Sequence, residues 1–176
     1  MVSDLRYPIG KFAFEAPSTE EQRQGWIDDI AGLPALVRAA VNGLDDAQLD
    51  TPYRPGGWTV RQVVHHLPDS HLNSYLRFRK ALTEDRPTIS AYDEAAWAEL
   101  TDARAAPVAL SLTLLEGLHA RWVVLLRSLR PQDYSCTFVH PESGREVELE
   151  RNLALYAWHG RHHLAHITAL KDRMGW

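Results

Sequence analysis

The chain has a single cysteine and no long apolar run. Cys136 cannot form an internal disulfide, which is typical of proteins that fold in a reducing compartment. A membrane-spanning helix needs roughly 20 consecutive apolar residues, so no such helix is expected. The first residues lack the charged start and continuous apolar stretch of a secretion signal. The sequence therefore predicts a cytoplasmic protein without a membrane partner.

Clusters of lysine and arginine are also absent. The formal net charge is −4, and the basic residues are scattered along the chain. Proteins that bind nucleic acid concentrate positive charge on one surface, so no nucleic-acid partner is expected. The motifs GxGxxG, GxxxxGK[ST], GxSxG and HExxH are missing as well. Nothing therefore indicates the common routes to nucleotide binding, serine hydrolysis or zincin-type proteolysis.

What is present is the composition of an ordinary globular protein, with 45% hydrophobic and 24% charged residues. A chain of 176 residues is long enough for one self-sufficient core, so a single domain over residues 1–176 is predicted. Ser18 with Glu21, and Thr59 with Gln62, have the spacing of helix N-terminal capping boxes. Apolar residues recur at helical intervals in four segments, at about 18–44, 59–82, 108–130 and 152–174.

Two prolines and one turn segment refine this pattern. Pro34 and Pro68 are expected to kink or interrupt the first and second helices. A short helix is expected at 93–100. Two β-leaning runs flank Pro-Glu-Ser-Gly at 141–144, which is typical of a hairpin. The predicted fold is all-α, a four-helix bundle with a small β-hairpin insertion before the last helix.

Four of the nine histidines lie within residues 159–166. Helical positions four apart share a face, which gives the pairs His159/His163 and His162/His166. His159 and His163 have the phase of the apolar stripe, so we expect them to face the interior and His162 to face solvent. Two inward, neutral imidazoles one turn apart form a natural clamp for a transition metal. Gly160 between them removes side-chain bulk and leaves space on the same face.

A catalytic zinc usually has three protein ligands and one open position, so a third ligand is expected from another helix. The segment VVHHLPDSH at 63–71 offers three candidates. By helical phase His65 faces outward, His71 lies in the apolar stripe and His66 flanks it. Because Pro68 can shift the phase, the pattern leaves both His66 and His71 open.

Other residues have simpler interpretations. Interior histidines can also hydrogen-bond to carbonyl or carboxylate groups and bind nothing, and we expect this of His119. Cys136 is expected to be a small apolar strand residue. Asp69, Asp93 and Glu94 could orient a ligand imidazole or act as a base, although capping or surface roles are more usual for such residues.

The segments RPGGWTVRQVVHHLPDSHLNSYLRFRKALTE and YAWHGRHHLAHI resemble the DinB/YfiT-like superfamily, and above all its YfiT branch of metal-dependent hydrolases. The resemblance runs nearly from end to end. It implies a DinB-type bundle, often a homodimer, in which three histidines hold zinc or nickel. Carried over to this chain, the ligands are His66, His159 and His163. The choice of His66 over His71 rests on the resemblance alone, and Pro68 departs from the small residue expected there.

The resemblance also implies one divalent metal per chain, with zinc expected and nickel as the alternative, and a small-molecule substrate. A metal with three imidazoles and an open position can lower the pKa of a water, which makes the protein a hydrolase. The same metal can lower the pKa of a thiol instead. The protein would then be an S-transferase that uses a low-molecular-weight thiol such as bacillithiol. A purely structural metal would need a fourth ligand, such as His71 or His166. No residue stands out as the general base, so the catalytic residues are unknown.

Overall fold

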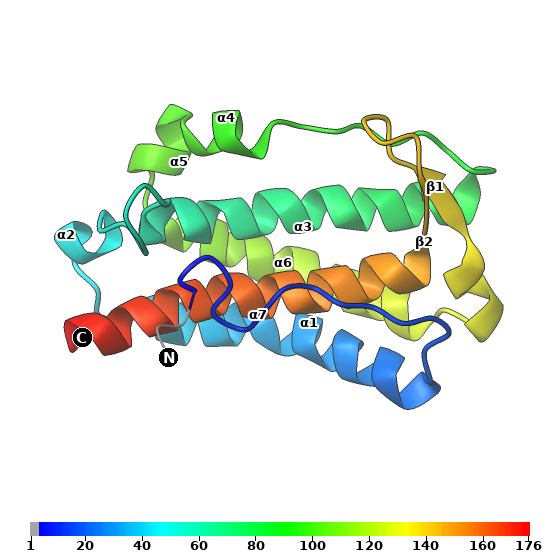
Figure 1. Ribbon diagram of the computed structural model, residues 1–176, viewed down its shortest axis with the longest axis horizontal. Coiled ribbons are helices and arrows are strands. Elements are labelled where there is room, and N and C mark those ends of the chain that lie inside the picture. Colours follow the sequence, from blue (N-terminus) through cyan, green and yellow to red (C-terminus); the bar gives the residue numbers. More distant parts are fainter. Residues whose placement is uncertain (1–3) are drawn as a thin grey trace.

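The computed structural model describes residues 4–176 and shows four long helices packed side by side (Figure 1). Both α1 and α3 contact α6 and α7, so α1 and α3 lie diagonally opposite each other. α1 and α7 run in one direction, and α3 and α6 run in the other (Figure 1). The predicted four-helix bundle is confirmed, with its helices at α1 (Glu20–Val41), α3 (Val60–Thr83), α6 (Val108–Arg127) and α7 (Leu149–Met174).

Short elements join the long helices. α2 (Asp46–Leu49) lies between α1 and α3, and a crossover that carries α4 (Glu94–Ala98) and α5 (Thr101–Ala105) leads from α3 to α6. The 3₁₀ helix η1 (Pro131–Ser135) and strands β1 (Thr137–Val139) and β2 (Glu146–Glu148) lie between α6 and α7. The strands pair antiparallel, with Phe138 opposite Val147. The expected hairpin before the last helix is therefore confirmed.

The crossover runs back along α3 and is fixed at both ends (Figure 1). At one end the backbone N–H of Ile89 donates to the carbonyl of Val139 in β1, at 3.1 Å. At the other, Nε2 of Gln62 donates to the carbonyl of Ala98 at 2.7 Å. The crossover therefore covers one side of α3 instead of extending into solvent.

Two expectations from the sequence were wrong: the position where the first helix begins, and the interruption of two helices by proline. The capping box of α1 uses Thr19 and Gln22, one residue later than predicted, whereas Thr59 and Gln62 cap α3 as predicted. Pro34 and Pro68 lie inside continuous helices. A proline removes one helical hydrogen bond, and here the burial of each helix against two neighbours offsets that loss.

α6 corrects the expectation that no segment could cross a membrane. By length and composition alone, residues 108–127 reach that threshold, as the core helix of a bundle also can. One face of α6 packs in the bundle through Leu115, Trp122 and Leu126. The opposite face leaves Leu114 and Val124 exposed. The apolar character of α6 thus has a packing role on only one of its sides.

Two apolar clusters fill the bundle. Trp122 and Phe78 belong to the first cluster, and Leu67 and Ile167 to the second. Along α7 the first cluster ends at Ala157 and the second begins at Ile167. The histidines of α7 lie between these two positions, so an imidazole layer separates the two parts of the core.

Candidate metal centre

Three imidazoles from two helices converge in this layer. One nitrogen each of His66, His159 and His163 lies within 4.8 Å of the others. Nε2 of His66 is 3.2 Å from Nε2 of His159. Two nitrogens on one tetrahedral zinc, each about 2.0–2.1 Å from the ion, are separated by about 3.3 Å. The nitrogens of His66 and His159 therefore already have the separation of two ligands on one zinc, and the nitrogen of His163 lies within 4.8 Å of both.

Burial keeps these imidazoles in the form that binds metals. Removal from water lowers the pKa of His66 to about 4. The same cause, followed by repulsion from neighbouring imidazoles, lowers the pKa of His159 and of His163 well below the ordinary value. All three are consequently neutral at pH 7, and their lone pairs are available to a cation.

A series of hydrogen bonds behind the cluster determines which nitrogen of His159 carries the hydrogen. Nδ1 of His119 lies 2.6 Å from the carbonyl oxygen of Ile30. A carbonyl only accepts, so Nδ1 of His119 must donate and its Nε2 accepts from Nδ1 of His71 at 2.9 Å. Nε2 of His71 in turn accepts from Nδ1 of His159 at 3.2 Å. The lone pair of His159 is therefore on Nε2, the nitrogen that faces His66.

Pro34 explains why that carbonyl is free. In a regular α-helix the N–H of residue 34 would bond to the carbonyl of Ile30, four residues earlier. Pro34 has no N–H and leaves the oxygen of Ile30 without its helical partner. His119 supplies the missing donor from α6. The proline inside α1 and the imidazole series thus belong to one arrangement.

The structure separates the two candidates that helical phase left open. His66 joins the cluster with His159 and His163, whereas His71 lies behind His159 as a hydrogen-bond partner. His119 is buried and has the structural hydrogen bond that the sequence predicted. His71 and His119 thus support His159 from within the core.

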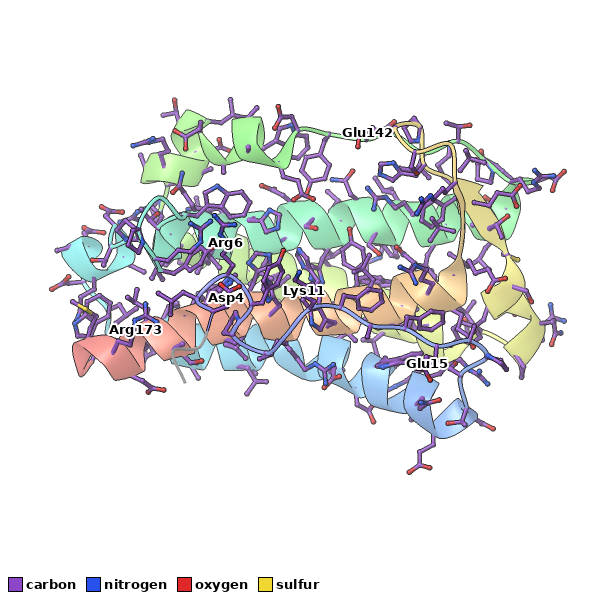
Figure 2. The ribbon with its side chains drawn as sticks, viewed as in Figure 1. Asp4, Arg6, Lys11, Glu15, Glu142 and Arg173 are labelled. Carbon is purple, nitrogen blue, oxygen red and sulfur yellow. The ribbon has the colours of Figure 1, made fainter. Side chains whose placement is uncertain are left out.

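The prediction that His162 faces solvent is wrong. Its ring stacks on Trp158 with centroids 4.4 Å apart, and Tyr7 of the N-terminal segment lies 5.9 Å away. That segment, residues 4–19, runs along α7 (Figure 1). Figure 2 shows Arg6 from this segment near the space between α3 and α7. A helical wheel describes one helix only, and so it could not show that a non-helical segment covers this face.

The prediction that His65 faces outward is also wrong, again because another segment covers this face of the helix. It is buried and contacts Oγ of Ser111 at 2.7 Å and the carbonyl of Ala106 at 3.1 Å. Both partners come from the end of the crossover and the first turns of α6. His65 therefore has the simple structural role that the sequence allowed for any interior histidine.

Gly160 lacks side-chain bulk on its face as expected, and the side chain of Leu33 fills the space. A Cβ at Gly160 would lie 2.5 Å from Cδ2 of Leu33 on α1. The glycine therefore permits α1 and α7 to pack closely beside the cluster. It does not open a chamber for a ligand.

A separate pocket of about 350 Å³ lies next to the cluster. One wall is the loop at 53–58 and the other is α7, from which His163 belongs to both the pocket and the cluster. His166, also in this wall, donates from Nε2 to the carbonyl of Arg6 at 3.2 Å and stacks on Tyr53 at 3.9 Å. A small molecule in the pocket would therefore lie beside one of the three converging imidazoles.

The acidic candidates differ in their roles. Asp93 caps α4 by accepting a hydrogen bond from the backbone N–H of Ala96 at 2.9 Å, which is the ordinary role allowed for it. Burial raises the pKa of Glu94, and the positive charge of Arg77 partly offsets this rise. Asp69 lies one turn after His66 on α3, and burial followed by repulsion from Asp102 raises its pKa to about 6. Asp69 is thus a half-buried carboxyl group one turn from His66 along α3, with Asp102 of the crossover as its charged neighbour.

Two features of the site were missed from the sequence. The carbonyl of Ile30 could have been found by asking which oxygen Pro34 deprives of a donor. Arg54 lies in the pocket wall, and its only signal was the turn sequence Arg-Pro-Gly-Gly. Cys136 packs against the core as expected, but it is not a strand residue, because it follows η1 directly and β1 begins at Thr137.

Comparison with known proteins identifies the family of the chain. Residues 21–167 match the model of the DinB superfamily. Proteins from Bacillus cereus and Bacillus thuringiensis subsp. konkukian, each named "Putative metal-dependent hydrolase", are 57% identical over 175 residues, which cover 99% of this chain and 100% of theirs. Their name and the three-histidine cluster together support a metal-dependent enzyme.

Two solved structures share the fold. TT2238, a four-helix bundle protein, has a TM-score of 0.58 at 22% identity over 84% of this chain and 98% of its own, a likeness of fold alone. YfiT from Bacillus subtilis, described as "a probable metal-dependent hydrolase with an unusual four-helix bundle topology", has a TM-score of 0.95 at 52% identity, covering 98% of both chains. The chain belongs to the DinB superfamily and is YfiT-like.

Proposed function

We infer that this protein is a metal-dependent hydrolase whose cation is held by His66, His159 and His163. The observation that carries the inference is the convergence of three neutral imidazoles beside a pocket. A divalent cation held there would lower the pKa of a water or thiol that reaches it. We propose one cation per chain, with zinc as the first candidate and nickel as the second, because imidazole suits both.

The protein supplies three further elements of the proposed reaction. The hydrogen bond that Nδ1 of His159 donates to His71 orients His159 and keeps its lone pair toward the cluster. The pocket beside His163 receives the small-molecule substrate. Asp69, one turn from His66 with a pKa raised to about 6, takes the proton from the attacking water. A carboxyl group with this pKa is ionised at pH 7 and can act as a base.

Thiol transfer is the second candidate function. The pocket wall contains no aspartate or glutamate within residues 4–176, so nothing acidic opposes an anionic thiolate there. In this reaction a low-molecular-weight thiol reacts as its thiolate, and sulfur bonds to an electrophile as the leaving group departs. Asp69 is then not needed as the base.

An assay with two arms separates these functions. Zinc-loaded and nickel-loaded protein is incubated with ester and amide substrates without thiol, and with electrophiles plus a thiol. We expect hydrolysis without thiol, lost in His163→Ala and Asp69→Asn. It should be retained in the control His140→Ala, which removes a histidine of the hairpin that lies outside the pocket and the cluster. Consumption of the electrophile only when thiol is present would instead establish the transferase.

A further inference from the structure

The pocket beside the cluster has a cationic wall. Arg54 is the one charged side chain among its described lining residues, and no described carboxylate lies within ion-pair distance of the guanidinium. The other side chains in the wall are imidazoles and the aromatic rings of Tyr53 and Trp58. Nη1 of Arg54 donates to the carbonyl of Pro55 at 3.0 Å, while Nη2 makes no hydrogen bond within residues 4–176. Arginine binds carboxylates through two parallel hydrogen bonds, and no acidic residue of the pocket wall competes for this group.

The loop is built to hold Arg54 in place. The N–H of Gly57 donates to the carbonyl of Arg54 at 2.9 Å, with Pro55 second in the turn and Gly56 third at φ +66°, which is the pattern of a type II turn. A Cβ at Gly57 would lie 2.7 Å from Cγ of Arg54. Glycine at this position therefore makes room for the stem of the arginine.

Tyr53 fixes the other side of Arg54. Nε of Arg54 donates to the hydroxyl of Tyr53 at 3.3 Å, and the guanidinium carbon lies 5.4 Å from the centre of the ring. Arg173, from the last turn of α7, donates to the carbonyl of Tyr53 at 2.6 Å. The guanidinium thus rests on a ring that is itself anchored to α7 and stacked on His166.

We propose that Arg54 binds a carboxylate of the substrate, so that the pocket selects acidic small molecules and directs their other end to the three-histidine cluster. The proposal rests on the proposed function, because it assigns the substrate class of the same site. One end of the ligand meets a fixed guanidinium in the loop at 53–58. The other end reaches His163, which the pocket shares with the cluster.

Hydroxamates of different charge test this proposal without any need for turnover. Acetohydroxamate is a neutral ligand for zinc, and the monohydroxamates of succinic and glutaric acid add a carboxylate at two distances. Isothermal titration of zinc-loaded protein gives the affinity of each probe. The variants are Arg54→Gln and, as a control, Arg121→Gln, which removes the same charge from an exposed position on α6.

We expect at least one acidic probe to bind the original protein about tenfold more tightly than acetohydroxamate. This preference should fall to about one in Arg54→Gln and persist in Arg121→Gln, while zinc content stays equal in all three proteins. Equal affinities for acidic and neutral probes, or a preference that survives in Arg54→Gln, would overturn the proposal and leave the metal site intact. Failure of acetohydroxamate to bind would contradict the open metal position and therefore both proposals.

Discussion

Pro34 and His119 meet at one backbone carbonyl. Nδ1 of His119 lies 2.6 Å from the oxygen of Ile30, which Pro34 leaves without a helical partner. Each neutral imidazole donates through one nitrogen only, so the hydrogen fixed on His119 also fixes those on His71 and His159. The position of a proline in α1 is thus coupled to the orientation of a nitrogen on α7.

The first prediction concerns this coupling. Leucine at position 119 cannot hydrogen-bond, so His119→Leu frees His71 to adopt either tautomer and loosens His159. Partners of metal-ligating histidines typically contribute about 10- to 100-fold to metal affinity. We expect zinc affinity, measured by competition with a chelating dye, to fall about tenfold or more.

The control for this experiment is His65→Leu. His65 is also buried and also bonds to a backbone carbonyl, but none of its hydrogen bonds reaches the cluster. We expect both variants to lose similar stability as metal-free proteins, whereas only His119→Leu loses affinity for zinc. Equal zinc affinity in the two variants would show that the imidazole series does not support the site.

The second prediction concerns the metal itself. His163→Ala removes one of three converging nitrogens, so we expect the loss of about one metal per chain. The measurement is elemental analysis of protein purified without chelators or affinity tags. The adjacent His162→Ala should keep its metal, because His162 lies outside the cluster, and equal metal loss in both variants would contradict the assignment.

The third prediction concerns the contact between α1 and α7. Gly160→Ala places a Cβ about 2.5 Å from Cδ2 of Leu33, and overpacking of this kind costs about 1–3 kcal/mol. The better helix propensity of alanine returns about 1 kcal/mol. We expect a net loss of about 1 kcal/mol in urea unfolding. In a Leu33→Ala background the same substitution should be stabilising, and a loss of equal size there would rule out this contact as the cause.

The fourth prediction concerns Asp69 and pH. Because its pKa is raised from 3.8 to about 6 in the folded protein, the folded state binds more protons than the unfolded state between these values. Its ionisation therefore lowers the free energy of unfolding as the pH rises through about 6. Asp69→Asn should stabilise the metal-free protein at pH 7.5 by on the order of 1 kcal/mol, a value reduced for solvent screening.

At pH 3.5 the carboxyl group is protonated in both states, and the benefit of Asp69→Asn should disappear. Buried histidines also respond to pH, but they are common to both proteins and cancel in the difference. Urea unfolding at pH 7.5 and pH 3.5 measures this difference in the free energy of unfolding between the variant and the original protein. A stabilisation of the same size at both values would show that ionisation of Asp69 is not its cause.

The parts of the fold that one helix determines by itself could be predicted from the sequence. Thr59 and Gln62 are three residues apart and cap α3 as expected. The phase of His159 and His163 against the apolar stripe correctly placed them toward the interior. Periodicity records which face of a helix meets the core, and these residues depend on that face alone.

What depends on other segments could not be predicted. The burial of His162 requires the N-terminal segment, and that of His65 requires the end of the crossover, and the periodicity of a long helix does not record which other segment covers it. The sequence also suggested breaks at Pro34 and Pro68, because local rules do not include the packing that keeps α1 and α3 continuous. The choice between His66 and His71 needed the position of α7 relative to α3.

Both ends of the described chain bear on the pocket. The carbonyl of Arg6 receives a hydrogen bond from His166, and Arg173, three residues from the last position, holds the loop through the carbonyl of Tyr53. Figure 2 shows Arg6 and Arg173 toward the same end of the bundle. A substitution of Arg173, or one that moves the backbone of Arg6, would therefore change the walls of the pocket although neither residue lines it.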